Sequence, residues 1–361
     1  MITTLLIGIG VVMVYSSSAV YSHQVRHDSM FYLKRHLAYV LCGLAAGILA
    51  MRIPILKMKK WVWPLMGSAC FIIVATSLFS DPSSGARRWI HLGPVTVQPS
   101  EFSKIIFALC AAVQLSAPNI RLEQFKRDLM PLSIPTGCLC LSILIGKDLG
   151  TVVVIAAVYI MMLFIKGMPL RKFFIIIGSM IPVLILAIVI EPYRVRRIVS
   201  FLNPLADTRN AGFQLYQSLL AVGSGGFTGT GIGQSQQKLF YLPAQYTDFI
   251  FAIIAEETGF IGSVIVILLF AGFGLVSLMI ILRCRQTFLK LFAFALSSLI
   301  LVEMTVNIGV SLGMLPTKGL ALPFISYGGS SLISKMLITG LLLNISKTSD
   351  STPLDPDDPG H

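Results

Sequence analysis

The chain has 361 residues, of which 55% are hydrophobic and only 12% are charged, and its formal net charge is +12. Its mean hydropathy of +0.83 excludes a water-soluble globular protein, because soluble domains carry about a quarter of charged residues. The composition predicts an all-α integral membrane protein, since a helix satisfies its backbone hydrogen bonds within the segment that crosses the bilayer.

Apolar stretches recur along the chain at about the 20-residue length that crosses the hydrocarbon core of a bilayer. We expect a polytopic protein with about ten transmembrane helices, some of them short or broken. The predicted spans lie near residues 2–21, 36–53, 61–80, 101–118, 132–146, 151–166, 173–190, 248–281, 288–315 and 331–346. The first stretch has neither a charged leader nor a small-residue cleavage site, so we interpret it as a retained span. The membrane domain is therefore predicted to cover residues 1–346.

Lysine and arginine in short connections predict which loops face the cytoplasm. The connections at 52–60 and 166–172 are short and purely basic, so we expect them on the cytoplasmic side together with the N- and C-termini. Residues 191–247 then form one long extracytoplasmic loop. Residues 347–361 contain four acidic residues and three prolines, a composition that predicts a disordered cytoplasmic tail.

The outer face carries many cations in this orientation. They are Arg87, Arg88, Lys104, Lys147, Arg194, Arg196, Arg197, Arg209, Lys238 and Lys318. Anchoring of long side chains at the lipid headgroups explains some of them. The alternative is that they gather an anionic ligand, and a phosphate-bearing lipid suits both the charge and the apolar surroundings.

The long loop contains the glycine-rich stretch "GSGGFTGTGIG", residues 223–233. The stretch follows no predicted strand and lacks the Gly-Lys-Ser/Thr ending of a phosphate-binding loop, so we reject a nucleotide site. Backbone with left-handed or flexible conformation is the role that its glycines favour.

Charged residues inside membrane spans are costly and are functional candidates by default. Glu101 and Lys104 are three residues apart on one predicted helix, which places them on one face. They form either a pair that neutralises itself or a pair directed at a ligand. Asp148 lies in a glycine-flanked turn, a position that aspartate often occupies for local reasons alone.

Three carboxylates near residue 250 are the strongest candidates. Asp248 is predicted in the first turn of a helix, where a carboxylate favours the positive helix end. Glu256 and Glu257 lie roughly 12–13 Å deeper along that helix, beyond the reach of capping. They require a partner such as Lys104 or Lys335, or protonation. We expect a polar cleft that descends from the outer face with Asp248 at its rim.

The segment at residues 313–333 interrupts an apolar region with Pro316, Lys318 and Pro323, followed by a Ser-Tyr-Gly-Gly-Ser-Ser run. Irregular backbone at membrane depth is tolerated only against protein or a water-filled cavity. We therefore predict a re-entrant or cleft-lining loop.

These motifs resemble the SEDS family (shape, elongation, division and sporulation), membrane glycosyltransferases that polymerise peptidoglycan from lipid II. The resemblance runs from residue 4 to about residue 345. It is carried, in order, by "GVVMVYSSSAV", "RRWIHLGPVTVQPSEFSK", "DLGT", "YLPAQYTDFIFAIIAEETGFIG" and "NIGVSLGMLPTKGLALPFISYGGSSL". The last motif is similar to the division branch of the family, with the rod-shape branch as the second choice.

The resemblance implies roles for individual residues. It makes Asp248 the catalytic residue. It assigns substrate binding to Arg87, Arg88, Glu101, Lys104, Asp148, Lys318, Ser326 and Tyr327, and support of the cleft to Glu256, Glu257, Pro316 and Pro323. Tyr246 departs from the family pattern, which has a histidine before "TDFIF".

The implied reaction uses Asp248 as general base on the GlcNAc 4-hydroxyl of an incoming lipid II. That oxygen attacks the anomeric carbon of the growing strand with inversion, and undecaprenyl pyrophosphate leaves. Cations of the outer face stabilise the pyrophosphate, and a divalent cation, Mg²⁺ or Mn²⁺, is a candidate to share this task. The sequence contains no ligand cluster that marks a metal site.

The implied partners are lipid II, the growing glycan strand, membrane lipid, a class B penicillin-binding transpeptidase and other division proteins, with no nucleic acid. The implied location is the bacterial inner membrane at the division site. Two alternatives are a flippase for a lipid-linked precursor and a non-catalytic scaffold of the division machinery. The residue pattern alone leaves enzyme and transporter open, and the resemblance decides for the enzyme.

Overall fold

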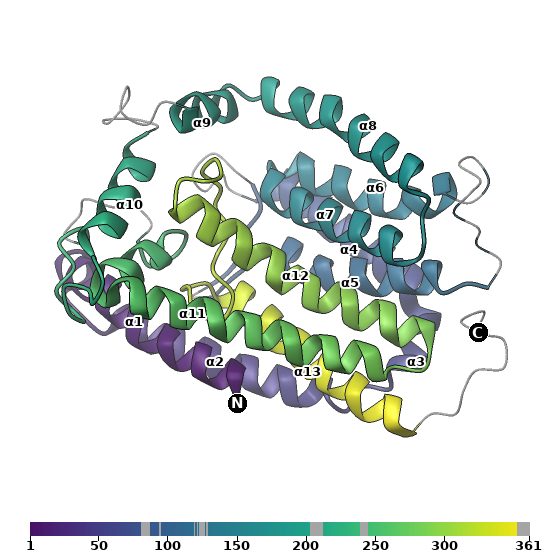
Figure 1. Ribbon diagram of the computed structural model, residues 1–361, viewed down its shortest axis with the longest axis horizontal. Coiled ribbons are helices and arrows are strands. Elements are labelled where there is room, and N and C mark those ends of the chain that lie inside the picture. Colours follow the sequence, from purple (N-terminus) through teal and green to yellow (C-terminus); the bar gives the residue numbers. More distant parts are fainter. Residues whose placement is uncertain are drawn as a thin grey trace. The chain divides into compact units, whose positions relative to one another are not determined.

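The computed structural model describes residues 1–80, 87–93, 95–118, 120, 122, 127, 129–202, 212–238 and 245–351. Helices dominate this part of the chain (Figure 1). The first half contains α1 (Ile2–Arg26), α2 (Phe31–Ala50), α3 (Ile55–Met58), the 3₁₀ helix η1 (Lys59–Trp61), α4 (Val62–Phe79), α5 (Pro99–Leu115), α6 (Met130–Ile145) and α7 (Leu149–Ile165). The second half contains α8 (Leu170–Val189), α9 (Pro192–Leu202), α10 (Phe213–Ser224), α11 (Ile250–Arg283), α12 (Thr287–Ser311) and α13 (Gly329–Ser351).

Each of the ten predicted spans coincides with a helix, which confirms an all-α polytopic fold. Within the described ranges, seven helical segments are long and apolar enough to cross a membrane. They are α1, α2, the α3 to α4 segment, α8, α11, α12 and α13. Helices α6 and α7 are apolar but shorter.

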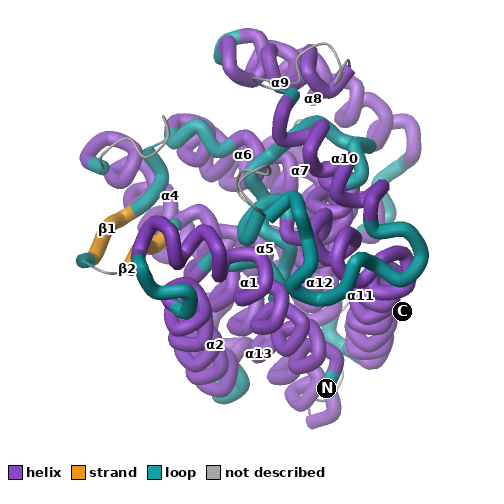
Figure 2. Tube along the Cα trace, turned by 90° about the vertical axis from the view of Figure 1, so that its left-hand side faces the viewer, coloured by secondary structure: helices purple, strands orange, loops and turns teal. Residues whose placement is uncertain are grey.

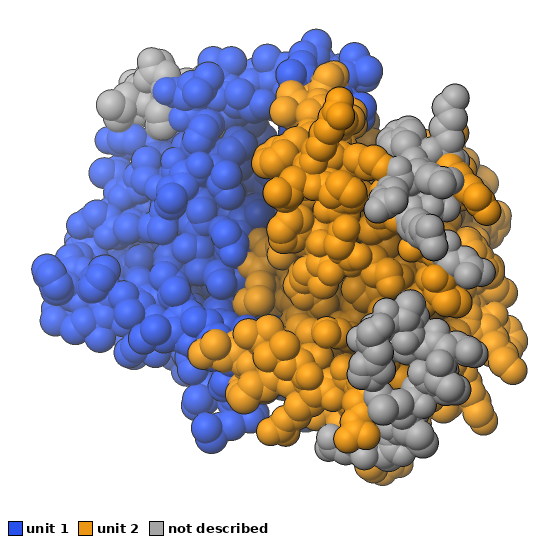
Figure 3. Space-filling model, turned by 45° about the vertical axis from the view of Figure 1, so that its right-hand side comes forward, with its two compact units in different colours: residues 1–42, 183–274, 303–332 blue, residues 43–182, 275–302, 333–361 orange. Residues whose placement is uncertain are grey.

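The chain divides into two compact units, which Figure 3 distinguishes by colour. Unit 1 comprises residues 1–42, 183–274 and 303–332, and unit 2 comprises residues 43–182, 275–302 and 333–361. The boundaries fall inside α2, α8, α11, α12 and α13, so these helices contribute residues to both units.

Unit 2 is built on the packing of α4, α5, α6 and α7. The fully buried alanines of α5, Ala108, Ala111 and Ala112, allow close packing of its neighbours. A short antiparallel hairpin, β1 (Ile90–Leu92) and β2 (Val95–Val97), leads into α5 (Figure 2). With three residues in each strand, this hairpin is too short to give a strand signal in the sequence.

The long helix α11, whose N-terminal part belongs to unit 1, is interrupted at Gly259. This glycine has φ 66° and ψ −161°, a conformation that only glycine adopts readily. In a continuous helix, the carbonyls of Glu256 and Glu257 would accept from the amides of Phe260 and Ile261. The interruption removes both bonds and leaves four backbone groups without helical partners.

The glycine-rich stretch supplies partners for all four groups. The amides of Thr230 and Gly231 donate to the two glutamate carbonyls at 2.9 and 3.0 Å. The carbonyls of Gly226 and Phe227 accept from the two amides beyond the break at 2.9 and 3.2 Å. The stretch therefore completes the hydrogen bonding of the interrupted helix, as buried backbone requires.

Glycine is required in this stretch for conformation and for close approach. The predicted left-handed backbone is confirmed, since Gly226, Gly229, Gly231 and Gly233 all have positive φ. A β-carbon at Gly229 would also overlap the backbone of α11 at Glu257. Larger residues would separate the stretch from the helix that it completes.

The segment predicted as one long loop, 191–247, is partly helical, because it contains α9 and α10. Helix α9 is held at two points that the sequence does not reveal. Arg194 donates to the Ala187 carbonyl at 2.5 Å, and Arg197 donates to the Thr317 carbonyl at 3.2 Å. These tertiary bonds stabilise a helix whose arginine-rich sequence suggested a polar loop.

The predicted tail begins later than residue 347. Helix α13 continues to Ser351, and the Ser349 hydroxyl donates to the Arg283 carbonyl at 2.9 Å. This contact holds the end of the helix where composition alone indicated disorder. The remainder of the predicted tail, 352–361, lies outside the described residues.

We predict that Gly259→Ala lowers the free energy of unfolding by about 2–4 kcal/mol, because alanine opposes the backbone conformation and meets the backbone of the glycine-rich stretch. The control is Gly67→Ala on α4, where a β-carbon meets nothing within 4 Å. Alanine there is expected to be neutral or slightly stabilising. Thermal unfolding in detergent micelles measures both variants, and equal melting temperatures would contradict the interpretation.

Candidate active site

Asp248 lies in a turn before α11 and is half-buried. The helix begins at Ile250, so the predicted position of Asp248 within the first helical turn is wrong. The cause is tertiary, because the backbone of this segment is bound to other parts of unit 1.

Three consecutive carbonyls, those of residues 246–248, each accept a hydrogen bond from a different group. The first accepts from the backbone amide of Tyr327 at 2.9 Å. The second accepts from the Ser326 hydroxyl at 2.5 Å, and the third from the Asn307 side-chain amide at 2.8 Å. The turn that carries Asp248 is thus fixed through its backbone.

An aromatic cluster lies beside this turn. The Tyr246 ring centroid is 4.7 Å from that of Tyr32, 5.9 Å from that of Tyr21 and 5.8 Å from that of Tyr327. Burial raises the pKa of Tyr246, and it raises the pKa of Tyr327 to about 12. These phenols remain protonated near neutral pH, so Tyr246 offers a hydroxyl and a ring face but no base in place of the family's usual histidine.

Of the segment predicted as a re-entrant or cleft-lining loop, 313–333, residues 313–328 have irregular backbone with internal partners, whereas residues 329–333 belong to α13. The Ser326 hydroxyl also accepts from the Leu322 amide at 2.8 Å, so it binds the protein's own backbone as both donor and acceptor. Pro323 is buried, whereas Pro316 and Lys318 are half-buried. Residues 313–328 are therefore non-helical and supported by the protein's own groups, whereas a role in lining a cleft stays a prediction.

Glu256 and Glu257 are 2% and 1% exposed, and both bind the chain around the glycine-rich stretch. The carboxylate of Glu256 accepts from the Ser235 hydroxyl in a very short bond and from the following backbone amide at 2.8 Å. The carboxylate of Glu257 accepts from the Ser16 hydroxyl at 2.6 Å and pairs with Lys238 at 3.1 Å. Their side chains therefore hold the same segment that completes the helix.

The partners predicted for these glutamates, Lys104 or Lys335, are replaced by Lys238. Residues 210–249 contain Lys238 as their one basic residue, a signal in the sequence that could have identified it. No sequence spacing indicates Ser16, which is 241 residues away from Glu257.

In unit 2, Glu101 bridges two buried lysines. Its carboxylate lies 2.7 Å from Lys104 and 2.8 Å from Lys335. The two lysines are each 1% exposed, and the Ser334 hydroxyl donates to the Glu101 carbonyl at 3.0 Å. The predicted same-face pair is present, and α13 adds a second ammonium group that the sequence did not place there.

Asp148 is the N-cap of α7. Its carboxylate accepts from the backbone amide of Thr151 at 3.2 Å and from the Thr151 hydroxyl at 2.9 Å. It also accepts from Gln98 at 3.0 Å and from Ser100 at 3.1 Å, and it lies 3.6 Å from Arg88. The turn role predicted for this aspartate is confirmed, and the same side chain joins α7 to the start of α5.

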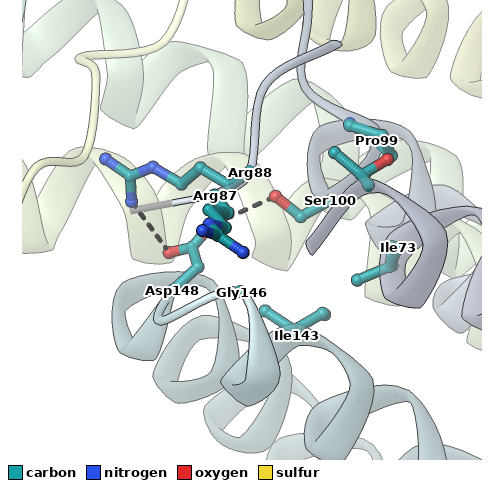
Figure 4. A pocket seen from close by; sticks show the side chains of 9 residues that line it. Ile73, Arg87, Arg88, Pro99, Ser100, Ile143, Gly146 and Asp148 are labelled. Carbon is teal, nitrogen blue, oxygen red and sulfur yellow. Dashed lines mark hydrogen bonds and ion pairs between the residues drawn. The ribbon is translucent and has the colours of Figure 1, made fainter. Parts of the chain in front are cut away.

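A small pocket opens beside this cap (Figure 4). Ile73 and Ile143 line its apolar side, while Arg87, Arg88 and Asp148 line its polar side. The two arginines that sequence analysis assigned to substrate binding therefore share one pocket with the predicted aspartate.

The predicted residues are divided between the two units. Unit 1 contains Asp248, Glu256, Glu257, Pro316, Lys318, Pro323, Ser326 and Tyr327, and unit 2 contains Arg87, Arg88, Glu101, Lys104 and Asp148. Sequence reasoning missed Asn307 on α12. The signal that could have identified it is a polar amide on an otherwise apolar helix.

The described residues contain no group of three or more His, Cys, Asp or Glu side chains that could hold a metal ion. The carboxylates of Glu101, Asp148 and Glu257 are bound to cations or hydroxyl groups of the protein. Among the described residues, this donor arrangement does not fit a protein-held Mg²⁺ or Mn²⁺ site.

Residues 1–351 match the family FTSW_RODA_SPOVE, described as "Cell cycle protein". The chain belongs to this family. The family resemblance that the sequence motifs indicated is therefore confirmed.

Individual relatives are similar in sequence to this chain over nearly its full length. It is 38% identical to "Probable peptidoglycan glycosyltransferase FtsW" of Geobacter sp. (strain M18), over 96% of this chain and 95% of that protein. It is also 38% identical to "Stage V sporulation protein E" of Bacillus subtilis (strain 168), over 96% of each chain. A solved chain from "Structural coordination of polymerization and crosslinking by a peptidoglycan synthase complex" matches with a TM-score of 0.81 at 24% identity over 97% of both chains, which shows the shared fold.

We predict an order of stability among variants of the Glu101 group. Glu101→Gln removes the carboxylate from two buried ammonium groups and should lower the free energy of unfolding by about 3–5 kcal/mol. Lys104→Met and Lys335→Met each leave a one-to-one pair, so each should lower it by less than half as much. Thermal unfolding in detergent micelles at neutral pH measures the three variants. A Glu101→Gln variant as stable as the lysine variants would show that the group is not held by its charges.

Proposed function

We propose that this chain is a peptidoglycan glycosyltransferase that polymerises lipid II into glycan strands at the outer face of the bacterial inner membrane during cell division. Relatives 37% and 38% identical over nearly the whole chain are named for this activity. The structural observation that carries the proposal is Asp248, a half-buried carboxylate on a turn whose three carbonyls each accept a hydrogen bond.

Asp248 acts as the general base in this proposal. Its carboxylate takes the proton of the GlcNAc 4-hydroxyl of an incoming lipid II, and the oxygen forms a bond to the anomeric carbon of the growing strand. The bond from that carbon to the pyrophosphate oxygen breaks, with inversion, and undecaprenyl pyrophosphate leaves with the electron pair. A fixed backbone suits this role, because a general base must lie within hydrogen-bond reach of the proton it takes.

The leaving pyrophosphate is stabilised by cations. We assign this role to Arg87, Arg88, Lys104 and Lys318, since charges held in water-poor surroundings stabilise a developing anion strongly. Two features support the assignment. Arg87 and Arg88 line one pocket, and the group of Glu101, Lys104 and Lys335 has a formal charge of +1, with two ammonium groups and one carboxylate.

Orientation follows from the same proposal. The termini and the basic connections 52–60 and 166–172 face the cytoplasm, and Asp248 faces outward at the division site. A cysteine at Ser224 should then react with an impermeant reagent from outside, whereas a cysteine at Lys59 should not.

We predict that Asp248→Asn lowers the rate of glycan polymerisation at least about a hundredfold, because asparagine keeps the shape but does not take the proton. Lipid II binding and the melting temperature should stay close to wild type. Labelled lipid II in proteoliposomes measures the rate. The matched control is Asp28→Asn, which alters an exposed carboxylate that lies 2.9 Å from Lys34, and it should polymerise at the wild-type rate.

Two outcomes would contradict this assignment. Near wild-type polymerisation by Asp248→Asn would exclude a general base at this position. A wild-type protein that makes no glycan yet moves lipid II across the bilayer would favour the flippase alternative.

We infer that a class B penicillin-binding transpeptidase and other division proteins bind this chain. The support is the fold shared with the solved chain from "Structural coordination of polymerization and crosslinking by a peptidoglycan synthase complex". We predict that the cognate transpeptidase raises the polymerisation rate when both proteins are reconstituted together. Full polymerisation by the chain alone, unchanged when the transpeptidase is added, would defeat this inference.

A further inference from the structure

Asn307 joins two segments of unit 1 that are distant in sequence. This residue lies on α12 and is only 2% exposed. Its side-chain nitrogen donates to the Asp248 carbonyl at 2.8 Å and to the Leu320 carbonyl at 2.6 Å. A side-chain amide nitrogen carries two protons, so these two bonds use its full donor capacity.

The side-chain oxygen of Asn307 differs from the nitrogen in its hydrogen bonding. This oxygen is buried and accepts no hydrogen bond from the part of the chain that the structure describes. A buried acceptor without a donor destabilises the folded state, so stability alone is a poor reason for an amide at this position. The contribution of Asn307 to the structure is therefore the two hydrogen bonds that its side-chain nitrogen donates.

The geometry of these bonds acts on the conformation of Asp248. The Thr247 carbonyl, held by Ser326, defines the peptide plane before Asp248. The Asp248 carbonyl, held by Asn307, defines the peptide plane after it. Because peptide units are planar, fixing both planes fixes φ and ψ of Asp248 and therefore the direction in which its side chain leaves the backbone.

We propose that Asn307 is a positioning residue for Asp248, an inference that rests on the proposed glycosyltransferase function. It holds the second of the two peptide planes, and through the Leu320 carbonyl it joins the turn of Asp248 to the segment that carries Lys318. Asp248 and the segment that carries Lys318 are thereby held in a fixed arrangement.

The chain contains a matched control for this inference. Asn344 on α13 is 7% exposed, and its side-chain nitrogen donates to the Ala50 carbonyl at 2.8 Å and to the Ile53 carbonyl at 2.6 Å. The two donated bonds and their distances match those of Asn307, while the Asn344 oxygen also accepts from the Thr348 hydroxyl at 3.2 Å. Asn344 lies in unit 2 and bonds none of the residues proposed for catalysis through this nitrogen.

The experiment compares Asn307→Ala with Asn344→Ala in proteoliposomes with labelled lipid II. Both variants lose two bonds to backbone carbonyls, and Asn344→Ala also loses the bond from the Thr348 hydroxyl, so its melting temperature should fall at least as far as that of Asn307→Ala. Asn307→Ala should lower kcat about 10- to 100-fold, since small misplacements of a catalytic group have effects of this size. Its KM for lipid II should stay within about threefold of wild type, and Asn344→Ala should keep both constants within about threefold.

Equal kcat values for the two variants would overturn the inference, because the role of Asn307 would then be structural only. A raised KM with unchanged kcat for Asn307→Ala would overturn it as well. If Asn307→Ala does not insert into the membrane, Asn307→Leu and Asn344→Leu, which keep the side-chain volume, provide the same comparison.

Asp248→Asn measured in the same preparation separates two kinds of failure. Near wild-type turnover by Asp248→Asn would remove the proposed general base, and the positioning role would fall with it. A loss of at least about a hundredfold in Asp248→Asn, together with unchanged kcat in Asn307→Ala, would overturn the positioning role alone.

Discussion

Buried backbone polar groups must be hydrogen-bonded, and this constraint is most severe in a protein that lies in lipid. The interruption of α11 at Gly259 exposes four such groups, and the glycine-rich stretch satisfies each of them. Glu256 and Glu257 hold the same region through their side chains, with Ser235, Ser16 and Lys238 as partners. Two of the three carboxylates singled out in the sequence are therefore explained by one structural requirement.

The same principle leads to the site. The turn of Asp248 is outside the helix because its carbonyls are bound by tertiary partners, and those partners belong to α12 and to the segment before α13. The irregular backbone here is held in place, because each carbonyl of residues 246–248 accepts a hydrogen bond from a tertiary partner. A general base on this turn needs no large reorganisation before it accepts a proton.

Sequence reasoning succeeded where the determinant is local. Hydropathy located the ten helices, the three-residue spacing paired Glu101 with Lys104, and the glycines indicated left-handed backbone. It failed where the determinant is a distant contact. Lys335 is 234 residues from Glu101, and Arg197 on α9 donates to a carbonyl 120 residues away, so neither contact follows from a local pattern. The prediction that Asp248 lies in the first turn of α11 was wrong for the same reason.

The irregular segments of unit 1 are held by hydrogen bonds of their backbone groups. Hydrogen–deuterium exchange of the wild-type protein in detergent micelles tests this claim directly, read from peptides that cover residues 226–233 and 319–328. We expect their bonded amides to exchange as slowly as amides inside the helical part of α11, because opening them requires local unfolding. Exchange as fast as that of an unprotected peptide amide would contradict the account.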